Sequence, residues 1–572
     1  MKNKTNIKKL FDAALDNHKK NNFPIAEKYY KKVLKVDPDH FDSNYLLGTL
    51  YLQSKKFNLA KIKFNRAIKI KSDHAALCNN MGATLIELGE YKEAINYFKK
   101  TINIQPNFAQ AYNNLGSILK EQQLHNEAAN YFRIAIKKEP KLKEAYINLG
   151  ITLKEIGELE MAANNFEKII KIYPKNYKAH QNLMETFEKA NKEKELILAI
   201  SNAKKLIGDI SITKLYEALI LYNNNKFIEA KDCLEKISFD DSDIKNHITR
   251  STTLANCYDR IGDAKSAYKY FLKANNLYPK LKKINFFDKK RYLNNIKIRQ
   301  KYFKKNKIKK WKNIQPSKIK LNPVFLIGFP RSGTTLLDAI LSSHPNVEVI
   351  EEKPLVKKLV DSLEESSQKD LNGLEDLEFN KLEEIRNVYF DSLKSEIKNK
   401  KNSDLYIDKL PLNMIHVGEI IRIFPNSKFI FSMRHPYDCV FSCFMQNFVL
   451  NDAMANFLNL RDAANLYDAA MKLWTQYLSI FKINYHEVKY ESLIKNFEST
   501  ARSILNFLKL PWDNSVLNYS ELVKKRKNIA TPSYNQVTKP IYTHAEGRWK
   551  KYEKQISNIY PILDPWIKKF KY

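Results

Sequence analysis

The residues of this chain best suited to chemistry form a short loop between an apolar run and the start of a helical pattern. Residues 328–335 read GFPRSGTT and follow the apolar run 324–327. A strand, a glycine-containing turn and a helix N-terminus direct backbone N–H groups and the positive end of a helix dipole at one place, which suits a phosphate group. The sequence therefore predicts a site for a phosphorylated ligand at this loop.

This loop differs from the loops that bind nucleoside triphosphates. Gly328 and Gly333 are separated by four residues, as in those loops, but Thr334 stands where they carry a lysine. Arg331 lies inside the loop and brings a positive charge instead. A P-loop kinase or nucleotide hydrolase is therefore a less favoured alternative for this part of the chain.

Charged residues also end three other segments with an extended pattern. An acidic pair, a lysine and an arginine stand at these ends, and a serine follows the arginine in a helical stretch. They are Glu351 and Glu352 after 348–350, Lys409 after 405–408, Arg434 after 428–433, and Ser442. Ligands of open α/β sheets bind at the carboxyl ends of the strands, so these residues are candidates for the same site as the loop.

The elements that must position these residues are short apolar strands that alternate with helical stretches. Strands are predicted at residues 324–327, 405–407, 428–432 and 486–489. Such alternation is typical of an α/β domain with a mostly parallel sheet. We assign this domain to residues 321–572, and we assign residues 282–320 to a basic, partly helical connector.

The first half of the chain repeats itself with a period of 34 residues. Glycines recur at this interval, and an alanine and a phenylalanine follow each of them at fixed distances. The series are Gly48, Gly82, Gly116 and Gly150; Ala60, Ala94, Ala128 and Ala162; Phe64, Phe98, Phe132 and Phe166. The pattern is typical of tetratricopeptide repeats: small residues let two helices approach, the aromatic fills the space between repeats, and a proline ends the second helix. Weaker copies extend this all-α superhelix over residues 7–281, as about seven or eight units.

Tetratricopeptide domains usually bind peptides or proteins on their concave surface, and the resemblance implies such a partner here. Asn80, Asn114 and Asn148 each precede one of the glycines by two residues and are candidates for lining that surface. The alternatives are that the repeats only scaffold, stabilise or dimerise the protein, and that these asparagines are solvated and inert.

The segments around the phosphate loop occur together in one family of enzymes. "GFPRSGTT", "HPNVEVIEE", "DKLP", "FPNSKFIFSMRHP" and "VKYESL" follow one another within residues 322–552. In this order they resemble the sulfotransferases that use 3′-phosphoadenosine 5′-phosphosulfate (PAPS). The similarity is closest to the tyrosylprotein sulfotransferase branch and to bacterial proteins that join tetratricopeptide repeats to such a domain. The resemblance implies PAPS as the sulfuryl donor.

The resemblance also implies a role for each candidate residue. Glu352, 21 residues after Arg331, would be the general base, and Lys409 would support the leaving phosphate together with Arg331. The residues implied for donor binding are Arg331, Ser332, Gly333, Thr334 and Thr335 at the 5′-phosphosulfate, Arg434 and Ser442 at the 3′-phosphate, Tyr490 at the nucleotide, and Lys539 and Arg548 as further 3′-phosphate ligands.

These roles fit the chemistry of sulfuryl transfer, an in-line displacement at sulfur. A carboxylate takes the acceptor proton, and cations stabilise the charge of the leaving phosphate. No metal is needed for this, and the sequence offers no cluster of metal ligands. We expect an enzyme that sulfates a hydroxyl, most of all a tyrosine in a protein or peptide that the repeats help to bind. A glycan, lipid or small-molecule hydroxyl is the first alternative, and a non-catalytic repeat scaffold is a further one.

Composition and charge exclude some classes of protein. The formal net charge is +34, but the basic residues are spread over the chain, so we interpret it as a compositional habit and expect no nucleic-acid partner. The five cysteines follow no metal-binding or disulfide pattern, as in a reducing compartment. The N-terminus lacks the apolar run of a signal peptide, and no stretch approaches the ~20 apolar residues of a membrane span. We therefore expect a cytoplasmic protein without a membrane span.

Overall fold

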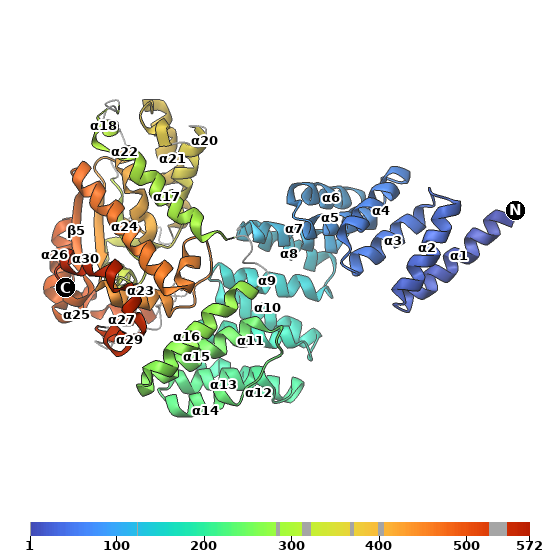
Figure 1. Cartoon of the computed structure of the whole chain (residues 1–572), viewed down its shortest axis with the longest axis horizontal. Coiled ribbons are helices and arrows are strands. Elements are labelled where there is room, and N and C mark those ends of the chain that lie inside the picture. Colours follow the sequence, from blue (N-terminus) through green and yellow to red (C-terminus); the bar gives the residue numbers. More distant parts are fainter. Residues whose placement is uncertain are drawn as a thin grey trace. The chain divides into compact units, whose positions relative to one another are not determined.

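The computed structural model describes residues 2–122, 124–281, 287–309, 311, 322–366, 371–397, 405–524 and 546–572. The chain divides into two compact units: unit 1 is Met1–Ile210 and unit 2 is Ser211–Tyr572. The elements of both are labelled in Figure 1. No helix among the described residues combines the length and the apolar composition needed to cross a membrane.

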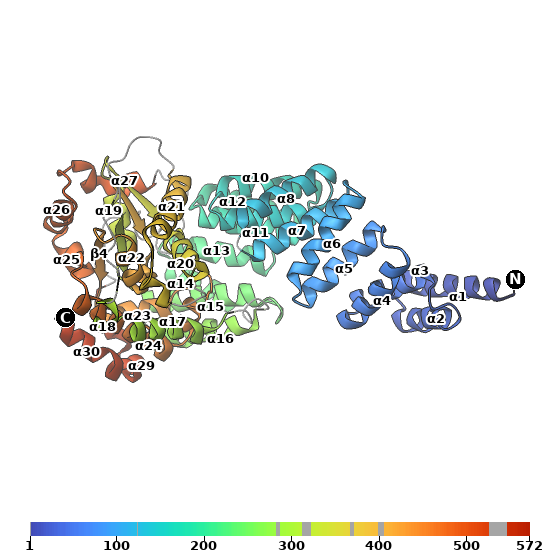
Figure 2. The ribbon, with the colours of Figure 1, turned by 90° about the horizontal axis from the view of Figure 1, so that it is seen from above.

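Unit 1 consists of helices that follow one another in pairs, and the pairs stack in sequence order (Figure 2). Each second helix in a pair ends two residues before the proline of the repeat, as at Ile104 and Pro106, so the predicted role of this proline is confirmed. The helices are α1 (Lys2–Lys19), α2 (Phe23–Val36), α3 (Phe41–Gln53), α4 (Phe57–Ile70), α5 (Ala75–Glu87), α6 (Tyr91–Ile104), α7 (Ala109–Glu121), α8 (His125–Lys138), α9 (Lys143–Glu155), α10 (Leu159–Ile172), α11 (Tyr177–Lys189) and α12 (Glu193–Ile207).

The repeating glycines allow the two helices of each pair to approach closely. A Cβ atom on Gly116 of α7 would lie 2.8 Å from the ring of Phe132 of α8. The same near-clash recurs between Gly82 and Phe98, where the distance would be 2.7 Å. Each phenylalanine ring is thus packed on the glycine of its own helix pair, and the rings are fully buried. The period-34 pattern therefore records a contact within each pair.

Replacing Gly116 with alanine is expected to lower the free energy of unfolding by about 1–3 kcal/mol, because an added methyl group must displace a buried ring. Urea unfolding followed by far-UV circular dichroism measures this change. Lys137→Ala, at an exposed position of α8, is the control and should leave the transition in place. An unchanged transition for Gly116→Ala would show that the close approach of ring and glycine is not tightly packed.

Unit 2 begins with the last four helices of the repeat pattern and continues into the predicted α/β domain. Its helices are α13 (Ser211–Asn223), α14 (Phe227–Glu235), α15 (Ile244–Ile261), α16 (Ala264–Leu277), α17 (Lys289–Tyr302), α18 (Lys305–Ile308), α19 (Thr334–Leu341), α20 (Leu355–Ser366), α21 (Phe379–Glu396), α22 (Val417–Ile423), α23 (Pro436–Phe444), α24 (Leu460–Ile480), α25 (Tyr490–Lys495), α26 (Phe497–Leu508), α27 (Tyr519–Lys524), α29 (Glu553–Ile556) and α30 (Tyr560–Phe570). Short 3-10 helices are η1 (Tyr278–Lys280), η3 (Leu371–Leu374), η4 (Pro411–His416), η5 (Met454–Leu458), η6 (Asn514–Asn518), η7 (Arg548–Tyr552) and η8 (Ser557–Ile559).

The sheet of unit 2 has five described strands, all parallel, in the order β2-β3-β1-β4-β5. They are β1 (Val324–Gly328), β2 (Val347–Glu351), β3 (Leu405–Lys409), β4 (Lys428–Met433) and β5 (Asn484–Lys489). The prediction of an all-α superhelix followed by an α/β domain with a mostly parallel sheet is confirmed. The chain leaves β1 toward one side of the sheet and later crosses to β4 on the other, so a crevice is expected at the carboxyl end of β1.

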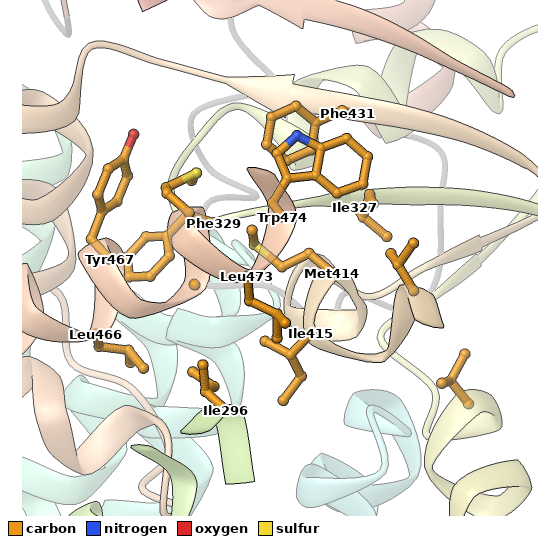
Figure 3. Packing of buried hydrophobic residues seen from close by; sticks show 14 of the residues in the cluster. Ile296, Ile327, Phe329, Met414, Ile415, Phe431, Leu466, Tyr467, Leu473 and Trp474 are labelled. Atoms are coloured by element: carbon orange, nitrogen blue, oxygen red, sulfur yellow. The ribbon is translucent and has the colours of Figure 1, made fainter. Parts of the chain in front are cut away.

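Both faces of the sheet are covered, as the alternation of buried side chains in β1 shows. Val324 and Leu326 belong to the apolar cluster that includes α19 and α26. Phe325 and Ile327 belong to a larger cluster on the other face, part of which is drawn in Figure 3. There Trp474 of α24 stacks on Phe431 of β4, with ring centroids 4.4 Å apart. Two buried faces hold the sheet, and therefore its carboxyl edge, in a fixed arrangement.

The last repeats share the larger cluster with the α/β domain. Ala255 of α15 and Phe271 of α16 are buried in the same cluster as Tyr552 of η7, and Ile296 of α17 also belongs to it (Figure 3). The two compact units accordingly divide at residues 210 and 211, inside the predicted superhelix. The boundaries at 281 and 320 stay a prediction from the repeat pattern, while the packing makes α13–α17 part of unit 2.

Candidate active site

The predicted phosphate loop lies between β1 and α19. Two of its residues have left-handed backbone conformations: φ is 69° at Arg331 and 104° at Gly333, the residue that caps α19. Glycine adopts this conformation readily, whereas a residue such as arginine does so at a cost of about 1–3 kcal/mol, which is typical of functional sites. The loop is thus a strand–turn–helix of the kind that presents N–H groups to an anion.

Close packing explains both glycines of the loop. A Cβ atom on Gly328 would lie 2.5 Å from the carbonyl oxygen of Ser432 in β4, and one on Gly333 would lie 2.8 Å from the ring of Tyr490. Ser332 is buried, and its Oγ has no hydrogen-bond partner among the described residues. A buried hydroxyl without a partner, between two glycines, suits a ligand oxygen that is not part of the chain.

The predicted 3′-phosphate residues meet the loop on the side of β4. The Arg331 Nε donates to the Ser442 Oγ of α23 at 3.0 Å. The Arg434 Nη1 donates to the Arg331 carbonyl oxygen at 3.3 Å, and the Arg434 guanidinium lies over the ring of Tyr490, 5.0 Å from its centroid. The structure therefore brings together four of the residues that the sequence proposed for donor binding.

Two cysteines of α23 support the loop from behind. Cys439 and Cys443 are both buried, and each Sγ donates to the Pro330 carbonyl oxygen at 3.2 Å. Burial raises the pKa of Cys439 to about 12, so its thiol stays protonated and can act as this donor. The expectation that the two cysteines share one face of a helix as small core residues is confirmed.

The second half of the site is a buried lysine among carboxylates. The Lys409 Nζ lies 3.0 Å from Glu352 Oε1, 3.4 Å from Glu351 Oε1 and 3.8 Å from Asp338 Oδ2. The lysine side chain is fully buried, whereas the side chains of Glu351 and Glu352 are 21% and 31% exposed. Lys409 is thus held in place, and the two glutamates face the surface from which an acceptor would arrive.

The sheet register brings these groups together. Lys409 lies opposite Glu351 of β2 on one side and opposite Leu326 of β1 on the other. One residue after β2, the N–H of Glu352 donates to the Lys409 carbonyl oxygen at 2.8 Å, and Glu352 has a left-handed φ of 51°. This turn directs the glutamate side chain back over the strand end, at a backbone cost that again marks a functional position.

Burial and charge act in opposite directions on Lys409. Burial alone would lower its pKa, but attraction to the three carboxylates outweighs burial and raises the pKa, so the side chain is a cation at neutral pH. The neighbouring Asp408 differs, because burial raises its pKa to about 8. Its carboxyl group, which accepts from the Tyr389 hydroxyl at 3.3 Å, is therefore largely uncharged at neutral pH.

Asp338 is a part of this site that the sequence interpretation missed. It lies on α19, is 1% exposed, and interrupts an otherwise apolar run, Leu336-Leu337-Asp338-Ala339-Ile340. A carboxylate in such a run is rarely buried without a charged partner. That signal was present in the sequence, but its partner lies 71 residues later at the end of β3.

The two last predicted ligands are placed differently. Lys539 lies outside the described residues. Arg548, at the start of η7, forms an ion pair with Asp259 of α15 at 2.8 Å. The roles of these two residues at the 3′-phosphate stay predictions. In the described parts of the chain, no three His, Cys, Asp or Glu side chains group as metal ligands would.

Comparison with known proteins agrees with this geometry. Residues 323–514 match the family described as "Sulfotransferase family". Tetratricopeptide repeats match at residues 82–123, 109–141, 143–176 and 252–281, and residues 19–101 match the description "Anaphase-promoting complex, cyclosome, subunit 3".

Several curated relatives are similar to the second half of the chain. An uncharacterised protein of Aquifex aeolicus is 32% identical over 45% of this chain and 34% of its own length. The protein-tyrosine sulfotransferase of Drosophila melanogaster is 27% identical over 40% of this chain and 46% of its own length. The human protein-tyrosine sulfotransferase 1 is 26% identical over 44% of this chain and 69% of its own length. The chain thus spans from about a third to about two thirds of the length of these relatives.

Solved structures of repeat proteins are also similar to parts of the chain. A tetratricopeptide repeat protein of Parabacteroides merdae matches 44% of this chain and 98% of its own length, with 16% identity and a TM-score of 0.35. YrrB, a repeat protein with a peptide-binding site, matches 30% of this chain and 88% of its own length, with 24% identity and a TM-score of 0.26. Helix pairs, parallel sheet and family matches agree: the chain joins tetratricopeptide repeats to a domain of the sulfotransferase family.

Proposed function

We propose that unit 2 transfers the sulfuryl group of PAPS to an acceptor hydroxyl, with Glu352 as the general base. The observation that carries this proposal is the pair formed by Glu352 and the buried Lys409, at 3.0 Å, at the edge of the sheet where the phosphate loop begins. Adjacent strands bring a base, a cation and an anion-binding loop to one place. These are the groups that a sulfuryl transfer requires.

The residues present fit the donor. The unpartnered Oγ of Ser332 and the close-packed glycines of the loop offer room and a hydrogen bond at the 5′ end. Arg434 and Ser442 are the residues that would hold the 3′-phosphate, and the half-buried Tyr490 would face the nucleotide. A donor with two phosphate groups accounts for two arginines around one loop, which a single phosphate does not require.

In this proposal each residue at the strand ends has one task. The donor supplies a sulfuryl group on a phosphate that leaves as an anion. Glu352 accepts the proton of the acceptor hydroxyl, for which its partly exposed carboxylate is suitably placed. Lys409 supplies positive charge near the leaving phosphate, and Arg331 supplies it from the loop. Asp338 and Glu351 keep Lys409 charged and oriented.

For the acceptor, we favour a tyrosine in a protein or peptide. The support is the name of the animal relatives and the ordinary pKa of a phenol, near ~10, which makes its proton easier to remove than that of an alcohol. A hydroxyl of a glycan, lipid or small molecule is the alternative. A cytoplasmic location stays a prediction from the sequence.

We further propose that the repeats of unit 1 bind a protein or peptide. The asparagines of successive first helices form a ladder: the Asn114 amide donates to Asn79 at 3.1 Å, and the Asn148 amide donates to Asn113 at 3.0 Å. The ladder fixes the carboxamides in a common orientation and also uses part of their hydrogen-bonding capacity. Scaffolding therefore remains the alternative for these repeats.

Calorimetric titration tests the donor assignment. The protein is expected to bind 3′,5′-ADP, the product that retains both phosphates, and to bind ATP with Mg²⁺ at least about 100-fold more weakly, since Thr334 replaces the lysine of triphosphate loops. Adenosine 5′-monophosphate is the control for the 3′-phosphate and should also bind weakly. Tight binding of ATP with Mg²⁺ but not of 3′,5′-ADP would contradict the sulfotransferase proposal.

A further inference from the structure

The last repeat helix pair contributes a charged side chain to the α/β domain. Asp259, near the end of α15, accepts from the Arg548 Nη2 at 2.8 Å, from the Arg548 Nε at 3.3 Å and from the Tyr552 hydroxyl at 2.7 Å. Asp259 is 4% exposed and Tyr552 is fully buried. Burial alone would raise the pKa of Asp259, but the Arg548 guanidinium and the Tyr552 hydroxyl outweigh it and hold the pKa below its usual value. The network is therefore charged and buried.

This network fixes η7 (Arg548–Tyr552) against the start of α23. The N–H groups of Gly547 and Trp549 donate to the two carboxylate oxygens of Asp438, at 2.7 and 3.0 Å. The Trp549 ring stacks on His435, with centroids 5.3 Å apart and planes at 17°. His435 directly follows Arg434 in the chain. An unbroken series of contacts thus leads from a repeat helix to the strand end that carries Arg434.

The ion pair also leaves part of the Arg548 guanidinium outside it. A guanidinium carries its N–H donors on three nitrogens, and Asp259 engages Nε and Nη2. A two-point contact fixes the plane of the group, and the Arg548 side chain remains 26% exposed. Arg548 is therefore oriented by Asp259 and still partly open to solvent.

We propose that Asp259 of the last repeat is a positioning residue for the donor site, which it acts on by fixing η7 and Arg548 beside Arg434. The proposal rests on the proposed function, because it assumes that the 3′-phosphate of the donor binds at Arg434. It makes α15 a part of the enzyme as well as a part of the repeat array. Asp259 touches no reacting atom, and its effect passes through Arg548 and Tyr552.

Titration of the full chain with 3′,5′-ADP tests this role. Asp259→Asn keeps the size of the side chain and loses its charge, and is expected to weaken binding about tenfold with unchanged stoichiometry. The matched control is Thr252→Val, which removes another hydrogen bond between α15 and the α/β domain, that of Thr252 to Asn447 at 3.0 Å. The control should bind within about twofold of the wild type.

The outcomes separate positioning from a merely structural role. If Asp259 only stabilised the fold, Asp259→Asn would melt at a lower temperature but bind 3′,5′-ADP like the wild type at temperatures where it is folded, and the proposal would be overturned. Tighter binding would also overturn it, because Asp259 would then compete with the phosphate for Arg548. A wild-type protein that does not bind 3′,5′-ADP would remove the proposed function itself, and the positioning role with it.

A second measurement needs no variant and covers the case in which Asp259→Asn does not fold. Saturating the wild type with 3′,5′-ADP is expected to slow amide hydrogen exchange in residues 546–552 and in the last turn of α15, because both would be ordered by the same bound ligand. The helices of unit 1 serve as the internal reference. Slower exchange around Arg434 without any change in residues 546–552 would contradict the proposal.

Discussion

Replacing Glu352 with glutamine is expected to remove most turnover while 3′,5′-ADP binding is retained. Glutamine has the same size and keeps a carbonyl oxygen toward Lys409, but it cannot accept the acceptor proton. The loss of a positioned general base lowers kcat by about 10²- to 10⁴-fold. Glutamine also tolerates the left-handed conformation at this position about as well as glutamate, so the loop is expected to stay intact.

The control for this variant is the neighbouring glutamate. Glu351 also contacts Lys409, at 3.4 Å, and the Glu351→Gln variant changes the charge around the lysine by the same amount. We expect its kcat to fall less than about tenfold, since a partner can be lost from a group of three carboxylates. Measured with labelled donor and a tyrosine-containing acceptor peptide, a kcat of Glu352→Gln within about threefold of the wild type would exclude Glu352 as the base.

Replacing Lys409 with methionine is expected to affect both stability and turnover. The lysine is the cation at the centre of three carboxylates, and the side chain of one of them, Asp338, is 2% exposed. Removing one partner of a buried ion pair costs about 3–5 kcal/mol, because the other charge stays buried without compensation. Turnover is expected to fall as well, since the leaving phosphate loses positive charge.

The two effects can be separated by a second substitution. Adding Asp338→Asn to Lys409→Met removes the uncompensated buried charge, so the free energy of unfolding should partly recover while kcat does not. The stability loss of the single variant should also depend on pH. A carboxyl group whose pKa is raised by burial binds its proton more tightly in the folded state, so folding is favoured as the pH falls and the loss should be smaller at pH 5 than at pH 8.

Equal stability of wild type and Lys409→Met at pH 8, measured by urea unfolding, would show that the carboxylates do not depend on the lysine. If the double variant recovered turnover together with stability, Lys409 would have a structural role only. The wild type should behave in the opposite way at high pH. Because the pKa of Lys409 is raised in the folded state, the stability it provides is present below the pKa of an unfolded lysine and is lost as the pH rises through the higher folded value.

The sequence allowed the strand-end residues to be predicted because the rule behind them is local. Lys409 and Glu352 each stand at the end of a short apolar run, and parallel strands bring their carboxyl ends to one edge of a sheet. The glycine series was equally legible, since each glycine meets a phenylalanine 16 residues later in the same helix pair. In both cases the period or position of a residue type carries the structural information.

Other contacts could not be predicted because no local pattern encodes them. Asp259 and Arg548 are separated by 289 residues, and Asp338 and Lys409 lie on elements with two strands between them in the chain order. The repeat pattern identified α15 and α16 as a helix pair but gave no sign that their apolar residues complete the core of the α/β domain. Whether an apolar face meets another repeat or a different domain depends on the tertiary structure alone.

The core that α15 and α16 share with the α/β domain also bears on how such a gene can change. Duplication or loss of the DNA for one helix pair of unit 1 alters the array by a whole repeat and leaves every residue of the larger apolar cluster untouched. The same event at α15 and α16 would remove Asp259 and Phe271 together. Selection therefore acts on the final repeat as on the enzyme, while the number of earlier repeats is free to vary between lineages.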